Sequence, residues 1–418
     1  MSIIRSNFTL IIASFMEDFV HLHVHTHYSI LDGQSKVSHL VDKAINNGMK
    51  GMAITDHGVM YGIKEFSDYC ASVNKKRKKD GLEPFKPILG CEMYVAHHHK
   101  EDKDKSAGDS SGYHLIVLAK NYHGYKNLIK LVSRSWVDGY YYKPRTDRYD
   151  LEKYHEDLIV SSACLGGEIP QKILAGDIKG AREAVEWYHN LFGDDFYLEL
   201  QRHQVTDPSL HANRETYPLQ QQVNKVLTQF AKEYGIKLIC TNDCHFEDKE
   251  TAEAHDHLLC LSTNKDLDDP TRMVYTKQEW FTTREEMNAI FSDIPEALSN
   301  TLEILDKVEV YSIDHGPIMP FFPIPESFGT EEEWHSKFTE EQLYKEFTTD
   351  ENGENPLPKD KADAVIERLG GYDKVYRIKF EADYLAKLAY DGARKHYGDP
   401  IPDEVKEHVK FELHVMKT

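Results

Sequence analysis

The chain has 418 residues, a length that predicts two domains, each large enough to bury a core of its own. Apolar residues make up 40% of the sequence and charged residues 29%, and no apolar run approaches the length of about eighteen residues that a membrane span needs. The composition therefore indicates a soluble globular protein without a membrane role. A formal net charge of −20 excludes a generally basic surface, so any DNA contact must be local or come from sequence outside this chain. The six cysteines form no CxxC pair, which favours a reducing compartment, and we therefore expect a cytoplasmic protein.

Residues 1–17 superficially resemble a short signal peptide, because Arg5 is followed by the apolar run from Phe8 to Ala13. The run is brief, and no small-residue cleavage pattern follows it. Since Met16 lies directly before an acidic pair and the first predicted strand, we expect residues 1–17 to be an extension ahead of the natural start.

From residue 19 onward, short β-branched runs alternate with longer segments whose apolar residues recur every three or four positions. Residues 37–45 form one such helical stripe, which Asn47-Gly48 should end. Seven strands are predicted, at residues 19–26, 51–55, 87–95, 113–119, 157–162, 195–202 and 236–241. Regular alternation predicts a parallel sheet, and seven units with no obvious edge strand predict a barrel-like α/β domain over residues 18–275.

After about residue 275 the alternation fades, and residues 297–305 form a helical stripe that leads into a proline-punctuated segment, 317–325. We expect a domain boundary near 275 and a mostly helical region over 276–418. The final stretch, 376–418, is again helical in pattern and has no capping signal at its end, which is typical of a truncated chain.

The strongest pattern for chemistry is the alternation in residues 20–27, VHLHVHTH. In a strand it places Val20, Leu22 and Val24 on one face and the histidines on the other. A single histidine beside a strand is more often a satisfied core residue than a metal ligand. Several on one face favour metal binding, because neutral imidazoles gain little from one another without a cation.

Further metal-competent side chains stand at the ends of later predicted strands. They are Asp56-His57, Glu92, His114, Cys164, and Asp243 with His245. Several cations in one site need four to six ligands each, and carboxylates can bridge neighbouring ions. Scattered core histidines would not be placed this way, so the pattern predicts a multinuclear metal site at one mouth of the barrel.

These motifs resemble the polymerase and histidinol phosphatase (PHP) family, which implies a distorted (β/α)7 barrel with a trinuclear metal site. The family's four motifs are matched by His23-Val24-His25, Asp56-His57-Gly58, His114 and Asp243-Cys244-His245. The ligand set that the resemblance implies is His23, His25, Asp32, His57, Glu92, His114, Cys164, Asp243 and His245. His21, His27 and His203 fall outside it and are expected to support the site or the fold, with a contact to substrate as the alternative for His203.

Longer stretches resemble the alpha subunits of bacterial DNA polymerase III, a family of replicative DNA-directed DNA polymerases. They include 27–33, 58–62, 86–92, 140–145, 241–245 and, near the passage from barrel to polymerase palm, 296–304. The resemblance implies that residues 276–418 begin the palm region. It places the polymerase aspartates on a Pro-Asp-x-Asp-x-Asp pattern, which this sequence lacks, so the chain alone is not expected to polymerise DNA.

For the metal site, the resemblance implies a 3′–5′ proofreading exonuclease acting on the primer 3′ end, with zinc or manganese favoured by the mixed ligands and magnesium as a further candidate. Two alternatives stay open: a metal-stabilised docking platform without catalysis, or a free small-molecule phosphatase, which would not need residues after 275. Expected partners of the full-length protein are DNA, a separate proofreading exonuclease subunit and the sliding clamp.

The segment Tyr140-Tyr141-Tyr142-Lys143-Pro144-Arg145 combines aromatic and basic residues. Its rings could stack on a base, and Lys143 and Arg145 could contact phosphate at the site's mouth. An ordinary aromatic loop that packs on the barrel explains the same residues equally well.

Overall fold

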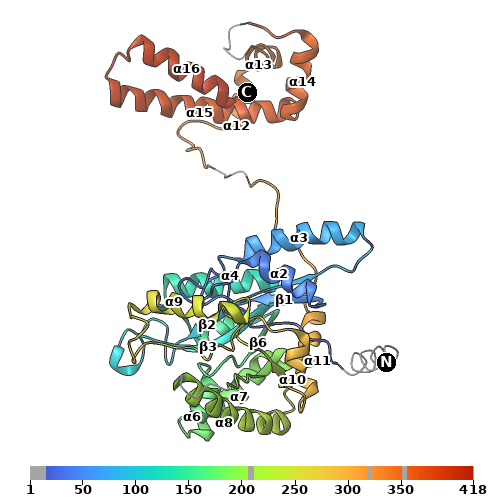
Figure 1. Ribbon diagram of the computed structural model, residues 1–418. Helices are drawn as coiled ribbons and strands as arrows, with labels where there is room; N and C mark the ends of the chain where they lie inside the picture. Colours follow the sequence, from blue (N-terminus) through green and yellow to red (C-terminus); the bar gives the residue numbers. More distant parts are fainter. Residues whose placement is uncertain (1–15, 206–210, 319, 321, 351–354, 418) are drawn as a thin grey trace. The chain divides into compact units, whose positions relative to one another are not determined.

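The computed structural model describes residues 16–205, 211–318, 320, 322–350 and 355–417, which divide into two compact units between His315 and Gly316 (Figure 1). Residues 1–15, which make up most of the expected N-terminal extension, lie outside the described residues.

The first unit is built on a curled sheet with the strand order β4-β5-β2-β3-β6-β7-β8 and with β1 also paired to β2. Its strands are β1 (Gly51–Ile54), β2 (Lys86–Val95), β3 (Tyr113–Ala119), β4 (Tyr140–Tyr141), β5 (Lys143–Thr146), β6 (Leu158–Ser161), β7 (Phe196–Leu200) and β8 (Leu238–Cys240). The six strands predicted between residues 51 and 241 are confirmed to within two residues at each end. The predicted α/β class is therefore confirmed.

The prediction of a wholly parallel sheet is wrong, because β3 runs antiparallel to both β2 and β6. Parallel neighbours need a crossover, which is usually an α-helix, whereas residues 96–112 join β2 to β3 without one. The sequence also gave no sign of the hairpin formed by β4 and β5, since strands of two and four residues are too short for a visible alternation.

Residues 19–26, the first predicted strand, are extended but form only an isolated bridge, between Val24 and Cys244. Backbone hydrogen bonds flank this segment on both sides. On one side the amide of Ala53 donates to the carbonyl oxygen of His21, and on the other the amide of His25 donates to that of Cys244. The segment thus connects the β1 end of the curled sheet to the chain that follows β8, as a seven-unit barrel requires.

Helices cover the outside of this sheet (Figure 1). α2, α3 and α4 pack against β1 to β3, α7 and α8 pack against β6 or β7, and α11 packs against β8. The bounds are α2 (Val37–Asn46), α3 (Ile63–Lys79), α4 (Tyr122–Val137), α5 (Arg148–Tyr154), α6 (Glu168–Leu174), α7 (Ile178–Phe192), α8 (His211–Tyr234), α9 (Ala252–Thr263), α10 (Arg284–Ile290) and α11 (Pro295–Lys307). α2 ends at Asn46, next to the predicted stop at Asn47-Gly48. Gly48 has a φ of 73°, a left-handed conformation that favours glycine.

The first unit continues to His315, beyond the boundary expected near residue 275. Phe281, Met287, Leu298 and Leu305 are buried in the same apolar core as the strands. The alternation of strands and helices in the sequence therefore ends before the domain does, because α10 and α11 still contribute to the core of the barrel.

The second unit is helical, as predicted for the C-terminal region. It consists of α12 (Glu331–Lys337), α13 (Glu340–Phe347), α14 (Lys359–Leu369), α15 (Tyr372–Tyr397) and α16 (Asp403–Lys417). Leu343, Phe347, Ile366 and Val375 form its small core. Among the described helices of both units, none combines the length and the apolar character needed to cross a bilayer.

Candidate metal centre

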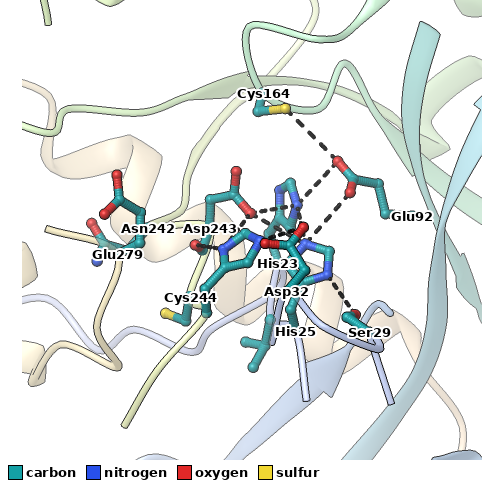
Figure 2. A network of polar contacts seen from close by, with 12 residues as sticks. His23, His25, Ser29, Asp32, Glu92, Cys164, Asn242, Asp243, Cys244 and Glu279 are labelled. Carbon is teal, nitrogen blue, oxygen red and sulfur yellow. Dashed lines mark hydrogen bonds and ion pairs between the residues drawn. The ribbon is translucent and has the colours of Figure 1, made fainter. Parts of the chain in front are cut away.

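The alternating segment places two histidines in a buried polar cluster (Figure 2). Val20, Leu22 and Val24 are buried in the apolar core, as the alternation predicts. His23 and His25 are fully buried, and their Nε2 atoms lie 3.2 Å apart. Burying two imidazoles this close is costly unless a further charge sits between their nitrogens.

Glu92, buried on β2, faces four histidines. Its Oε1 lies 2.8 Å from Nδ1 of His114 and 3.3 Å from Nε2 of His23. Its Oε2 lies 2.6 Å from Nδ1 of His57 and 3.4 Å from Nε2 of His25. A carboxylate surrounded in this way is placed to bridge neighbouring cations.

Asp243, which follows β8, approaches the same pair of histidines from another side. Its Oδ1 lies 3.0 Å from Nε2 of His23 and 3.2 Å from Nε2 of His25. Asp243 has a φ of 48°, a conformation that is costly for a residue with a side chain and that recurs at functional sites. The His25 ring is stacked between those of His57 and His245, at 4.0 and 4.3 Å.

Asp32 is brought to the cluster by the tight loop that follows the alternating segment. Its Oδ2 lies 2.9 Å from Nε2 of His57 and 3.9 Å from Nε2 of His245. Gly33 makes this loop feasible, because a Cβ there would lie 2.1 Å from the carbonyl oxygen of Thr26.

Cys164, which follows β6, completes the set. Its Sγ lies 3.5 Å from Nδ1 of His114. The same atom lies 3.8 Å from Oε1 of Glu92 (Figure 2). All nine residues of the expected ligand set thus lie in one cluster. Three groups of potential ligand atoms within 4.8 Å of one another are His25, His57 and His245; His23, His25 and Asp243; and His57, Glu92 and His114.

Several buried polar atoms in this cluster make no hydrogen bond, which fits a site for divalent cations. Nδ1 of His57, Oε2 of Glu92, Oδ1 of Asp243 and Nε2 of His245 are buried and make no hydrogen bond of acceptable geometry. Buried polar atoms are normally satisfied, and exceptions need an explanation such as a bound ion. Imidazole, carboxylate and thiolate groups are also the donors that divalent transition metals take in proteins.

The close packing of these groups shifts their proton affinities in opposite directions. Burial opposes protonation of His57, but the carboxylates of Glu92 and Asp32 outweigh it and raise its pKa to about 10. Burial, reinforced by the neighbouring His57, lowers the pKa of His25 to about 3. Burial and the charge of Glu92 raise the pKa of the Cys164 thiol well above its usual value. Cys164 would therefore become a thiolate only beside a cation.

Glu199 on β7 supports the cluster, and the sequence did not reveal it. Its buried Oε1 accepts a hydrogen bond from Nδ1 of His23 at 2.8 Å, and its carboxylate also accepts from the hydroxyls of Ser161 and Thr241. The bond to Nδ1 fixes the His23 tautomer and leaves Nε2 free for a cation, as is usual for metal-binding histidines. Glu199 lies in a buried strand with no motif around it, so only the tertiary structure identifies it.

A second support acts on His25. Its Nδ1 donates to Oγ of Ser29 at 3.0 Å, and that hydroxyl donates to Oδ1 of Asp56 at 2.7 Å. On the far side of the cluster, the hydroxyl of Tyr275 donates to Oδ1 of Asp32 at 3.1 Å. These contacts hold the histidine and the carboxylate in one orientation.

The histidines outside the expected ligand set have structural contacts. His21 donates from Nε2 to the carbonyl oxygen of Thr282, and burial lowers its pKa to about 4. His27 is exposed. His203 is buried, donates from Nε2 to the carbonyl oxygen of Asn242 and accepts from Nε2 of Gln220, so both ring nitrogens are engaged and the substrate contact considered for it is not supported.

The two basic residues of the aromatic segment lie in different environments. Lys143 is exposed, and its Nζ lies 5.2 Å from the centre of the Tyr94 ring, beside the cluster. Arg145 is fully buried, and its guanidinium donates to the carbonyl oxygens of Gly139, Lys100 and Asp102. The expected phosphate contact by Arg145 is therefore wrong, because its buried side chain joins residues 96–112, which connect β2 to β3, to β5.

Comparisons with known proteins identify the family to which this region is similar. The PHP domain model matches residues 21–203, which include every residue of the expected ligand set except Asp243 and His245. The chain is 41% identical over 341 residues to a DNA polymerase III subunit alpha of Borreliella burgdorferi, covering 80% of this chain and 28% of the relative. The chain carries a PHP domain and is homologous to DNA polymerase III alpha subunits.

Other relatives extend the similarity along the chain. The DNA polymerase III subunit alpha of Chlamydia pneumoniae is 31% identical over 421 aligned positions, covering 95% of this chain and 31% of the relative. The chain thus spans less than a third of the length of these alpha subunits. A two-domain protein of Bacteroides vulgatus, described as containing a predicted PHP-like metal-dependent phosphoesterase, superposes with a TM-score of 0.31 at 12% identity, covering 72% of this chain and 75% of that one. So low a score carries no argument.

Proposed function

We propose that the PHP domain of this chain is a metal-dependent phosphodiesterase that removes nucleotides from the 3′ end of DNA. In this proposal the domain is the proofreading part of a longer replicative DNA-directed DNA polymerase. Its ligands are His23, His25, Asp32, His57, Glu92, His114, Cys164, Asp243 and His245.

The proposal rests on nine metal-competent side chains from distant parts of the sequence that meet in one cluster. Buried nitrogen and oxygen atoms lie close together in this cluster without forming hydrogen bonds. A merely structural cluster would join these atoms by hydrogen bonds to one another or to backbone groups. Five imidazoles, three carboxylates and one thiol supply enough donors for three cations. Nitrogen and sulfur among them favour zinc or manganese over magnesium, which prefers oxygen ligands.

When bound, such cations lower the pKa of a water molecule, neutralise phosphate oxygens and align the attacking and leaving groups. The chain's own residues provide the geometry. Glu92 and Asp243 each face two or more histidines and would hold the cations together with them. Glu199 and Ser29 orient His23 and His25, and Lys143 stands beside the cluster where it can contact a phosphate.

The relatives' shared name supports the wider setting of the proposal. A DNA polymerase III alpha subunit would act in the cytoplasm on a primer 3′ end, together with other replicase subunits such as the sliding clamp and a separate proofreading exonuclease. In that setting, the polymerase aspartates would lie in sequence beyond this chain.

A primer-degradation assay tests the proposal. The 418-residue chain is incubated with a 3′-mismatched primer and manganese or zinc, beside the variants His23→Ala and His27→Ala. His27 belongs to the same segment but is exposed and outside the cluster, so it is the matched control. We expect His27→Ala to keep wild-type activity. His23→Ala should lose more than the roughly 10- to 100-fold that removal of an outer-shell partner costs.

Activity that persists in His23→Ala would exclude the cluster as its source. If the wild type binds metal but degrades no primer, the docking platform without catalysis replaces the exonuclease.

A further inference from the structure

Three exposed aromatic side chains gather where α4 ends and the β4–β5 hairpin begins. Trp136 is 40% exposed, Tyr140 48% and Tyr142 59%. The rings of Trp136 and Tyr140 are stacked, with centroids 5.3 Å apart and an interplanar angle of 15°. We call Trp136, Tyr140, Tyr142 and Lys143 the aromatic hairpin. Large rings usually pack in the core, so rings that stack on each other in solvent need an explanation.

The aromatic hairpin is fastened to the loop that carries the ligand candidate His57. Nε1 of Trp136 donates to the carbonyl oxygen of Gly58 at 2.8 Å. A Cβ on Gly58 would lie 2.7 Å from Cγ of Pro144, so loop and hairpin are in direct contact. The aromatic rings therefore keep a fixed position relative to the metal cluster.

Lys143 links the hairpin to the cluster through one further ring. Its Nζ lies 5.2 Å from the centroid of Tyr94. The Tyr94 ring in turn lies 5.1 Å from that of His114 and 6.2 Å from that of His57. An ammonium group held here contacts the same ring that contacts His57 and His114, and it can pair with a phosphate that approaches the cluster.

Tyr142 occupies the tip of the hairpin. Its φ of 61° is a left-handed conformation that is uncommon and costly for a bulky residue. The Nζ atom of Lys105 lies 5.6 Å from the centre of its ring. A turn that keeps an aromatic ring exposed beside two lysines, in a chain with a net charge of −20, favours an anionic partner that also has flat apolar faces.

We propose that the aromatic hairpin binds single-stranded DNA, with unpaired bases stacked on Tyr142 and on the Trp136–Tyr140 pair and a backbone phosphate held by Lys143. For its substrate class, this inference rests on the proposed phosphodiesterase function. Aromatic stacking is available to every base, so the surface would hold an unpaired 3′ end of any sequence next to the metal cluster. Paired bases present no free faces, and a duplex would therefore bind more weakly.

Binding to a fluorescein-labelled single strand tests this directly. Fluorescence anisotropy of the full chain is measured in chelator, where hydrolysis cannot occur, at low ionic strength. We expect Tyr142→Ala to weaken binding about tenfold, within the range of base stacking. Tyr142→Phe should bind within twofold of the wild type, because stacking needs the ring and not the hydroxyl, and it reports on the site if the alanine variant folds poorly.

Tyr122→Ala is the matched control, because Tyr122 is also exposed with a lysine, Lys126, 5.1 Å from its ring centre. Tyr122 begins α4, whereas Trp136 lies near its end. A helix of 16 residues is about 24 Å long, so Tyr122 is far from the aromatic hairpin. Its affinity should equal that of the wild type.

Wild-type binding that is undetectable, equal for duplex and single strand, or unchanged in Tyr142→Ala would overturn the inference. Because this measurement needs no catalysis, an inactive metal cluster would not affect it. Conversely, a working exonuclease whose KM and strand affinity are both indifferent to Tyr142→Ala would leave the proposed function standing and remove only this surface.

Discussion

Two buried polar clusters in the first unit differ in how they satisfy their charges. In one, Lys100 lies 3.2 Å from Asp150 and 3.5 Å from Asp147, and Arg134 donates from Nε to both carboxylate oxygens of Asp150. Cations and anions alternate, and none of these four side chains has a buried polar atom without a partner. The cluster is complete within the protein.

The other cluster, around Glu92 and Asp243, has no lysine or arginine among its nine members. Its only internal cations are histidines such as His57, which neighbouring carboxylates hold protonated, and several of its buried nitrogen and oxygen atoms make no hydrogen bond. The contrast shows that burial of charge alone does not indicate a ligand site. A buried carboxylate cluster whose only internal cations are histidines predicts a site where metal ions can replace their protons.

The largest loss of stability is expected from a substitution in the cluster of Lys100, Arg134, Asp147 and Asp150. Asp150→Asn removes a fully buried negative charge and leaves Lys100 and Arg134 underpaired, which should lower the free energy of unfolding by about 3 kcal/mol. Urea unfolding followed by tryptophan fluorescence measures it, and the loss should be the same with and without chelator.

Asp68→Asn is the control for Asp150→Asn, since Asp68 pairs with Lys64 on an exposed helix surface, where ion pairs contribute little. Equal stability of Asp150→Asn and Asp68→Asn would mean that the buried network is not a structural element. A loss that disappears on addition of metal would place Asp150 in the metal site.

A smaller effect is expected from Glu199→Gln, which should lower metal affinity about 10- to 100-fold while the fold is retained. The reason is that the neutral side-chain amide of glutamine replaces the charged carboxylate that accepts the hydrogen bond from Nδ1 of His23. Competition with a chromophoric zinc chelator measures the affinity directly.

Glu168→Gln is the control for Glu199→Gln. Glu168 is also a buried glutamate, but its carboxylate contacts Arg148 and Tyr188 and not the metal cluster. Metal affinity that falls equally in both variants would point to a general loss of stability. An unchanged affinity in Glu199→Gln would show that His23 needs no such support.

The sequence predicted much of the site because the site follows the strands. Ligand candidates such as His57, Cys164 and Asp243 stand where a buried strand ends, and that position can be read from alternating apolar residues. Glu199, Ser29 and Tyr275 could not be found this way. They act through hydrogen bonds to other side chains, and nothing in their spacing records which residue they face.

The errors have the same origin. Arg145 looked like a phosphate ligand because its neighbours are aromatic and basic, yet burial turned its guanidinium toward backbone carbonyls. The antiparallel direction of β3 depends on how residues 96–112 run, and a polar loop has no periodicity from which direction could be inferred. Local pattern predicts which residues form strands, but not the direction of a strand or the partner of a side chain.

In the proposed function, the histidine and carboxylate cluster holds divalent cations. Elemental analysis of the chain purified without chelator tests it most directly, with Asp243→Asn as the matched variant and urea unfolding measured before and after chelation. We expect zinc or manganese bound at more than one ion per chain, less in Asp243→Asn, and a lower free energy of unfolding once the metal is removed. Wild-type protein with no more metal than Asp243→Asn, and with the same stability in chelator, would contradict it.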